Sequence, residues 1–198
     1  MHRLTLIALL VLNSFFATAQ LNYTLKYKDS SNSILKISIE TPTPLTAPVS
    51  FIMPRSIPGG YGVYIYDKFI ENIYSVSIDG KKKPMLKDEN GAPRWYCTDT
   101  GKIISQVEYE VDLNKMERQV LPGDASIIRP GFAGILNYSV FGWIDGTEKQ
   151  TVQCTIETFY QWPVFTTIHP SVSPAKGLLK FNTDNYYTLA DGQIFIGP

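Results

Sequence analysis

The sequence has 198 residues, and its 18 Lys and Arg residues balance its 18 Asp and Glu residues, so the formal net charge is zero. This balance leaves no basic surface for a phosphate backbone, which argues against a nucleic-acid partner. The length corresponds to one domain of ordinary size. Aromatic residues make up 13% of the chain, and Tyr is the most frequent of them, a composition that favours strands over helices.

The N-terminus has the order of a secretory signal peptide. A positive start at 1–3 precedes an apolar run at 4–12, and Ala-Thr-Ala at 17–19 is a small-x-small cleavage site. The run is shorter than the roughly 20 residues that a membrane span needs. We therefore expect a signal peptide over 1–19, export to the periplasm or the extracellular space, and no membrane contact of the mature chain. The alternative is an uncleaved N-terminal anchor.

Alternation of apolar and polar residues is the main pattern of the mature chain. It runs through the segments 21–27, 35–40, 74–79 and 107–113. Each of these segments predicts a strand with one buried face, because successive side chains of a strand point to opposite sides. By this pattern Tyr74, Val76 and Ile78 share the buried face of their strand.

Turn residues separate the predicted strands. Asp79-Gly80 and Asn90-Gly91 are hairpin dipeptides, because glycine takes a positive φ at little cost. The stretch 114–131 has no clear period and is expected to be a long loop. Short strands with frequent turns predict an all-β fold, an antiparallel β-sandwich with long loops, in a single domain over 20–198.

A loop of unusual composition lies at 53–61, Met-Pro-Arg-Ser-Ile-Pro-Gly-Gly-Tyr, and tyrosines crowd the segment after it. Such a loop either turns a corner, with its tyrosines filling the sandwich, or offers backbone and aromatic groups to a partner. Interfaces are enriched in tyrosine and arginine. The residues of this candidate cleft or domain-docking loop are Arg55, Pro58, Gly59, Gly60, Tyr61, Tyr64 and Tyr66.

Cys97 and Cys154 are the only cysteines of the chain. Export would permit a disulfide between them. The alternative is that both act as small hydrophobic residues on inward strand faces, and Cys154 alternates with apolar residues as that alternative requires. Trp95 alternates with Cys97 and is predicted to be buried.

The sequence lacks the residues of a catalytic or metal site. It has no H-E-x-x-H motif, and the one histidine after the signal peptide, His169, is expected in a solvated loop. A site of His169, Cys97 and Cys154 would match no metal-ligand spacing. Glu108 and Glu110 share one face of one strand and are expected to mark its solvent side, whereas glycosidase carboxylates face each other across a cleft. We therefore expect this chain by itself to be no enzyme and to bind no cofactor.

Several short motifs follow one another in a characteristic order. Pro-Gly-Gly-Tyr at 58–61 and Tyr-Asp-Lys-Phe at 66–69 come first. Asp-Gly-Lys at 79–81 and Arg94-Trp95 come next. In this order they resemble the N-terminal β-sandwich of the M61 (glycyl aminopeptidase) metallopeptidase family.

The resemblance extends to the end of the chain. The segments 137–141 and 155–157 resemble the paired strands that close the family's domain, and 189–198 resembles its connection to the catalytic domain. Gly60 stands where the family has serine, and 114–131 does not match the family pattern.

This resemblance implies a non-catalytic N-terminal domain of an exported zinc aminopeptidase. Its partner would be the catalytic domain of the same polypeptide, and it would help to shape the cleft that receives the peptide substrate. Zinc and the catalytic residues would lie downstream of residue 198. The alternative is a freestanding secreted β-sandwich that binds a peptide or glycan, because sandwiches host many functions.

Overall fold

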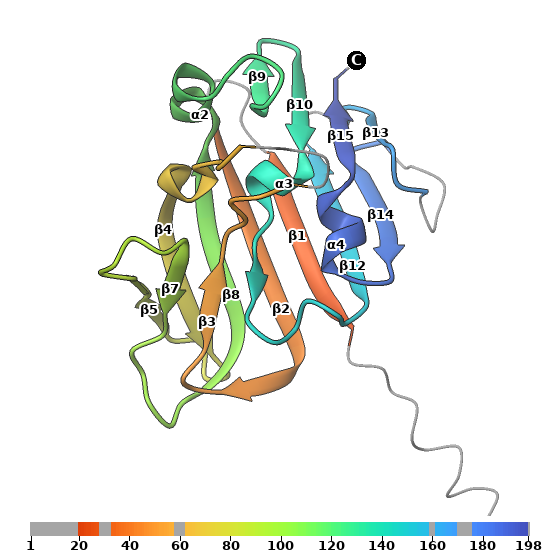
Figure 1. Cartoon of the computed structure of the whole chain (residues 1–198). Helices are drawn as coiled ribbons and strands as arrows, with labels where there is room; N and C mark the ends of the chain where they lie inside the picture. Colours follow the sequence, from red (N-terminus) through yellow and green to blue (C-terminus); the bar gives the residue numbers. More distant parts are fainter. Residues whose placement is uncertain (1–19, 28–32, 58–61, 159–160, 170–175, 198) are drawn as a thin grey trace, which may run out of the picture.

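The computed structural model describes residues 20–27, 33–57, 62–158, 161–169 and 176–197. Within them three β-sheets form an all-β sandwich with four short helices (Figure 1). The predicted fold class is therefore confirmed. In the described part of the chain, no helix is long and apolar enough to cross a membrane.

One layer is a seven-stranded sheet with the order β14-β12-β1-β2-β8-β4-β5. Its strands are β1 (Leu21–Tyr27), β2 (Ile34–Thr46), β4 (Ile70–Ser77), β5 (Lys82–Pro84), β8 (Ile103–Asp112), β12 (Val152–Thr158) and β14 (Leu178–Thr183). Neighbouring strands are antiparallel except β1 and β12, which are parallel. Along β1, β2 and most of β8, the alternating apolar residues are buried as the sequence predicts.

The other layer contains two four-stranded sheets. The first, with the order β13-β15-β10-β9, is made of β13 (Val164–Thr166), β15 (Gln193–Ile196), β10 (Phe132–Leu136) and β9 (Ile127–Arg129). The second, with the order β11-β3-β7-β6, is made of β11 (Trp143–Ile144), β3 (Ser50–Ile52), β7 (Arg94–Tyr96) and β6 (Leu86–Lys87). The core lies between the layers, where the ring of Phe51 packs 4.7 Å from the ring of Tyr109.

Buried tyrosines account for much of the aromatic content. The hydroxyls of Tyr23, Tyr109 and Tyr186 donate hydrogen bonds of 2.8–3.0 Å to the three successive backbone carbonyls of 140–142. All three rings are buried, and a buried hydroxyl is costly unless it is paired. The tyrosines therefore fill the core and fix the segment that leads into β11. Gly142 has no room for a side chain there, because a Cβ would lie 2.4 Å from the carbonyl oxygen of Ile52.

The predicted buried face of 74–79 is only partly confirmed, because Val76 is buried but Tyr74 is half-buried. β4 ends at Ser77, and its pairing with β8 shifts register between Glu71 and Tyr74 and again after Val76. An extra residue in a strand exchanges the two faces beyond it. As a result Ser75 is buried, and Ile78 is exposed.

The long loop predicted over 114–131 is also wrong. This stretch contains most of a two-turn helix, α2 (Leu113–Gln119), and the strand β9. The helix begins where the Asp112 carboxylate accepts a 3.0 Å hydrogen bond from the backbone N–H of Lys115, as an N-cap does. It buries only Leu113 and Met116, so its apolar pattern is too short to show a helical period.

Two segments near the C-terminal end differ from what the resemblance implied, a strand over 137–141 and a connection over 189–198. Segment 137–141 is largely a short helix, α3 (Asn137–Val140), and only 155–157 lies in a strand. Segment 189–198 contains the end of a second short helix, α4 (Tyr186–Ala190), and then β15. β15 pairs with both β10 and β13, so this segment belongs to a sheet and is more than a connection.

Four predictions, on two turns, one buried residue and one exposed residue, are confirmed. Gly80 and Gly91 have φ values of 79° and 77°, which the predicted hairpin turns require. Trp95 on β7 is 4% exposed. His169 is exposed, as a loop histidine is expected to be.

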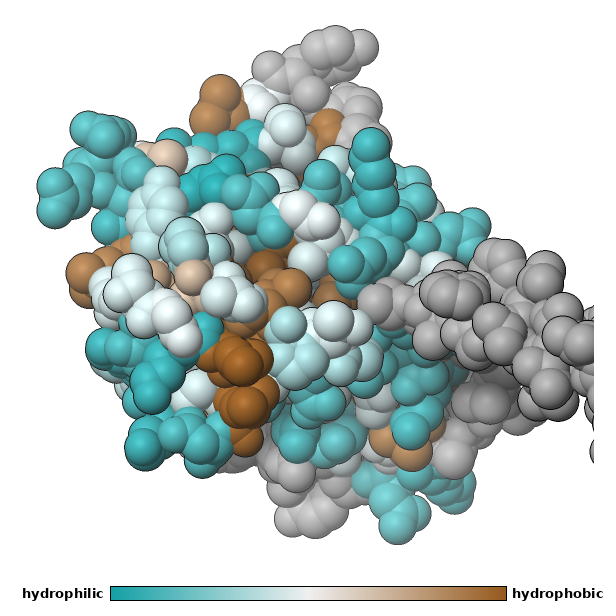
Figure 2. All heavy atoms as spheres, turned by 90° about the horizontal axis from the view of Figure 1, so that it is seen from below, coloured by the Kyte–Doolittle hydropathy of each residue, from teal (hydrophilic) through white to brown (hydrophobic). Residues whose placement is uncertain are grey.

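The two ends of the sandwich differ. The C-terminus lies at one end, with α2, β9 and β10 (Figure 1). Figure 2 shows the opposite end, which is mostly hydrophilic around a narrow hydrophobic strip. Ile78 and Ile103 lie toward this end, since β4 ends at Ser77 and β8 begins at Ile103.

Candidate functional site

The proline- and glycine-rich loop leads from β3 to a 3-10 helix, η1 (Tyr66–Phe69). The backbone N–H of Tyr64 donates a 2.9 Å hydrogen bond to the carbonyl of Arg55, which closes the loop at its base. Pro58, Gly59, Gly60 and Tyr61 lie outside the described residues. The structure therefore places only Arg55, Tyr64 and Tyr66 of the seven candidates.

Arg55 is held by a buried carboxylate. Asp67 accepts hydrogen bonds of 2.8 Å from both Nε and Nη2 of Arg55, and one of 2.9 Å from Nζ of Lys87. Arg55 Nη2 also donates to the carbonyl of Gly91 at 2.8 Å. Burial by itself would raise the pKa of Asp67, but the hydrogen bonds from Arg55 and Lys87 outweigh it, and the pKa is lowered. Arg55 is thus engaged inside the domain and anchors the loop.

The tyrosines of this segment form a cluster. The rings of Tyr64 and Tyr66 stack with centroids 5.5 Å apart, and the ring of Tyr138 lies 5.7 Å from that of Tyr66. Tyr66 is fully buried, and its hydroxyl donates a 2.7 Å hydrogen bond to the carbonyl of Asp124. Burial raises the pKa of Tyr66 well above its usual range. Tyr66 therefore fills the sandwich, while Tyr64 is only half-buried and can still contact a partner.

Sequence reasoning missed three members of this site: Asp67, Lys87 and Tyr138. Asp67 stands in the Tyr-Asp-Lys-Phe motif at 66–69, but nothing in the sequence indicates its partners. Lys87 is 20 residues away along the chain, in β6, and its Nζ donates to Asp67 at 2.9 Å. Only the tertiary structure joins them.

Cys97 and Cys154 are both buried free thiols, so the structure does not contain the disulfide that export would permit. Sγ of Cys97 lies 3.3 Å from Oγ of Ser75. Cys154 sits in β12, between β1 and β14, and burial raises the pKa of its thiol. Both cysteines occupy inward positions, as the second alternative described.

We predict that neither thiol of the folded protein reacts rapidly with Ellman's reagent, because both are buried and out of its reach. The raised pKa of Cys154 slows that thiol further, since it holds little reactive thiolate. The absorbance of the released thiolate measures the reaction. In denaturant without reductant, both thiols should become reactive. Protein from an oxidising compartment that shows no thiol in denaturant would instead contain the disulfide.

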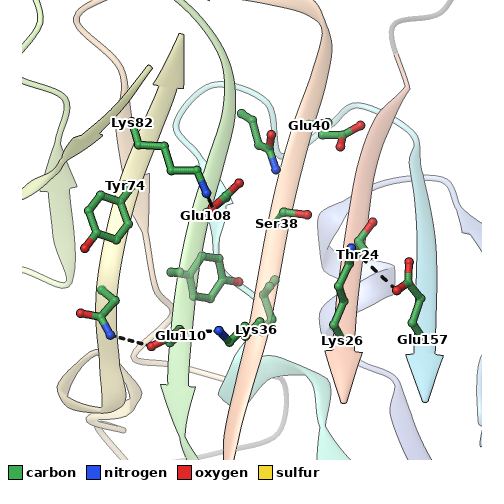
Figure 3. Close-up of a pocket in the computed structure, with 14 residues that line it drawn as sticks. Thr24, Lys26, Lys36, Ser38, Glu40, Tyr74, Lys82, Glu108, Glu110 and Glu157 are labelled. Atoms are coloured by element: carbon green, nitrogen blue, oxygen red, sulfur yellow. Dashed lines mark hydrogen bonds and ion pairs between the residues drawn. The ribbon is translucent and has the colours of Figure 1, made fainter. Parts of the chain in front are cut away.

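A shallow groove of about 550 Å³ crosses the outer face of the seven-stranded sheet (Figure 3). Its charges pair across strands: Lys82 with Glu108 at 2.5 Å, Lys36 with Glu110 at 3.2 Å, and Lys26 with Glu157 at 3.7 Å. Glu108 and Glu110 thus lie on the outer, solvent side of β8, as predicted. The groove is polar, and three of its four glutamates are paired with lysines, which suits a sheet face in contact with water.

Within the described ranges, no group of three His, Cys, Asp or Glu side chains could hold a metal ion. The sequence also matches a known family of protein domains. The model of the peptidase M61 N-terminal domain matches residues 22–198. The chain belongs to this family.

Two larger proteins of known structure contain a region whose fold is similar to that of this M61 N-terminal domain. An aminopeptidase N family protein from Idiomarina loihiensis aligns with a TM-score of 0.75 and 19% identity, over 90% of this chain but only 29% of that protein. Yeast LTA4 hydrolase in complex with bestatin aligns with a TM-score of 0.51 and 12% identity, over 91% of this chain and 28% of the enzyme. At these identities the likeness concerns the fold alone. No curated protein matches the sequence.

Proposed function

We propose that this chain is the non-catalytic N-terminal domain of an exported M61-type zinc aminopeptidase. In this role it packs on the catalytic domain of the same polypeptide and helps to shape the cleft for the peptide substrate. Zinc and the catalytic residues belong to the part of the polypeptide after residue 198. The match to the M61 N-terminal domain over 22–198 carries the proposal.

Three further observations support it. The chain spans less than a third of the length of the solved structures that it resembles, as one domain of a larger enzyme would. The order of residues 1–19 supports export. The loop closed by Arg55 and Tyr64 carries the exposed Val63 and the half-buried Tyr64, so its surface is available to line a cleft.

The gene sequence beyond codon 198 tests the proposal. An H-E-x-x-H motif soon after this point, together with hydrolysis of glycyl or alanyl arylamides by the complete protein, is the expected result. A stop codon directly after Pro198 would contradict the proposal.

We predict that the 198-residue chain alone hydrolyses neither glycyl nor alanyl arylamides, even with zinc added. The physical reason is the lack of an H-E-x-x-H motif and of any histidine after the signal peptide other than the exposed His169. Release of the arylamine chromophore measures the activity. Turnover that disappears in a His169→Ala variant would show that the chain has a catalytic site of its own.

A freestanding binding module for a peptide or glycan is the second candidate, and the groove on the outer face of the seven-stranded sheet favours it. Tyr74 lines this groove and could stack on a sugar ring or a side chain. This function requires a natural stop codon after Pro198, and binding in a glycan or peptide array that a Tyr74→Ala variant loses.

A further inference from the structure

The outer face of the sheet β13-β15-β10-β9 is apolar, in contrast to the polar outer face of the seven-stranded sheet. Phe165 and Phe195 are directly opposite each other on β13 and β15, and both are exposed. Gly134 of β10 lies next to Phe195, and Ile127 of β9 lies next to Gly134. These residues form one row across all four strands. Exposed Phe132 lies on the same face, two residues before Gly134.

The outer face of the seven-stranded sheet and the outer face of β13-β15-β10-β9 differ in the number of charged side chains that they carry. The outer face of the seven-stranded sheet carries the ion pairs of the groove (Figure 3). On the four strands of the small sheet, all within the described residues, the outward positions hold only one charged side chain, Arg129, and its guanidinium is paired with Glu117. A face that remained in water would be expected to carry charges, and depletion of charge with enrichment of aromatic residues is typical of an interface core.

A glycine, Gly134, lies in the middle of this apolar row. Gly134 has no side chain, and a Cβ at this position would lie 3.5 Å from Cγ1 of Ile127 and 4.0 Å from Cδ1 of Phe195. These are ordinary contact distances, so the strand itself does not require a glycine there. Because Gly134 has no side chain, a partner can approach the backbone of β10 closely between two apolar neighbours.

The C-terminus lies at this face. β15 carries Phe195 and ends at Ile196, two residues before the last residue of the chain. The backbone of Gly197 runs beside Phe132, where a Cβ on the glycine would lie 2.9 Å from Cβ of the phenylalanine. Any domain that follows Pro198 is tethered beside the phenylalanines, and a short tether raises its effective concentration there.

We infer that the outer face of β13-β15-β10-β9, which we call the phenylalanine face, is the surface on which the catalytic domain docks. The inference rests on the proposed function and adds the location and chemistry of the contact. The catalytic domain presents an apolar patch to Phe165, Phe195 and Phe132, and it approaches the backbone closely at Gly134. The opposite end of the sandwich, which is mostly hydrophilic in Figure 2, stays in water.

The test compares two aspartate variants in the complete protein encoded by the gene. Phe165→Asp places a charge on the phenylalanine face, and Ile78→Asp is its matched control toward the opposite end. The two side chains are 63% and 61% exposed, so both substitutions burden the domain itself to a similar extent. The measurements are the rate of limited proteolysis just after residue 198 and the calorimetric unfolding profile.

We expect Phe165→Asp to increase the cleavage rate by about tenfold or more and to separate the unfolding of the two domains, because a buried unpaired charge opposes docking. Ile78→Asp should leave both measurements unchanged. Gly134→Glu is a second variant, which places a charge in the same apolar row at a position with room for a Cβ. It should change both measurements as Phe165→Asp does. Equal behaviour of all three variants and the wild type would overturn the inference.

Three other outcomes bear on this inference and on the proposed function. If the complete protein is an active aminopeptidase and the face variants behave as the wild type does, only the docking surface is wrong. A stop codon directly after Pro198 overturns both. If the 198-residue chain forms dimers that Phe165→Asp dissociates in sedimentation, the face belongs to a second copy and the inference is also overturned.

Discussion

Replacement of Trp95 by alanine is expected to lower the free energy of unfolding by about 3–5 kcal/mol, the range for truncation of a large buried aromatic residue. The indole is 4% exposed and packs with its centroid 5.7 Å from that of Phe51. Nζ of Lys87 lies 5.0 Å from the centre of its ring. The alanine variant would therefore leave a cavity beside Phe51 in the core and remove a cation–π contact.

Urea unfolding of the 198-residue chain measures this loss. Tyr96→Ala is the matched control, because Tyr96 is the next residue on β7 and points to the other, exposed side. Its hydroxyl donates a 3.0 Å hydrogen bond to Asp88 on the surface, so we expect a loss of only about 1 kcal/mol. Equal losses for the two variants would mean that Trp95 is not the anchor of this sheet.

Replacement of Asp67 by alanine is expected to cost about 2–4 kcal/mol, because the carboxylate is fully buried and receives three charge-assisted hydrogen bonds. This loss of stability should be smaller than the largest losses known for removal of one partner of a buried ion pair. The side chains of Arg55 and Lys87 are 33% and 40% exposed, so both cations can turn to water when Asp67 is removed.

Asp145→Ala is the control for Asp67→Ala. Asp145 also pairs with an arginine, Arg94, but its side chain is half-exposed, and exposed ion pairs contribute about 1 kcal/mol or less. Comparison of the urea midpoints at neutral pH separates the buried pair from the exposed one. A loss for Asp67→Ala as small as that for Asp145→Ala would show that the Arg55–Asp67 contact does not hold the loop.

The contribution of Asp67 should depend on pH in one direction. Its pKa is lowered in the folded protein, so its stabilisation is fully present above the ordinary carboxyl pKa and is lost as the pH falls through the folded pKa. The stability difference between the wild type and Asp67→Asn should therefore be largest near neutral pH and shrink below about pH 4. Urea titrations across this range test the direction.

Lys87 couples the two sites, since its ammonium contacts both the indole of Trp95 and the carboxylate of Asp67. The free-energy losses of Trp95→Ala and Asp67→Ala are therefore not expected to add in the double variant.

How well the sequence predicts this fold depends on how regular each strand is. Alternation located the strands at 21–27 and 35–40, because one face of each is buried and their pairing is continuous until Glu40. It misplaced Ser75 and Ile78 in the segment 74–79, because the two register shifts of β4 are set by its pairing with β8. A bulge depends on the neighbouring strand, so one segment read by itself does not reveal it.

The sequence by itself determined the sandwich, the hairpin turns, the burial of Trp95 and the family resemblance. These follow from local propensity, from alternation and from the order of short motifs. Only the tertiary structure decided that Arg55 is an anchor and Tyr66 a core residue, because their partners Asp67, Lys87 and Asp124 come from other segments. It also brought together Phe165, Phe195 and Gly134 from three strands, because contacts between distant segments arise only when sheets form and pack.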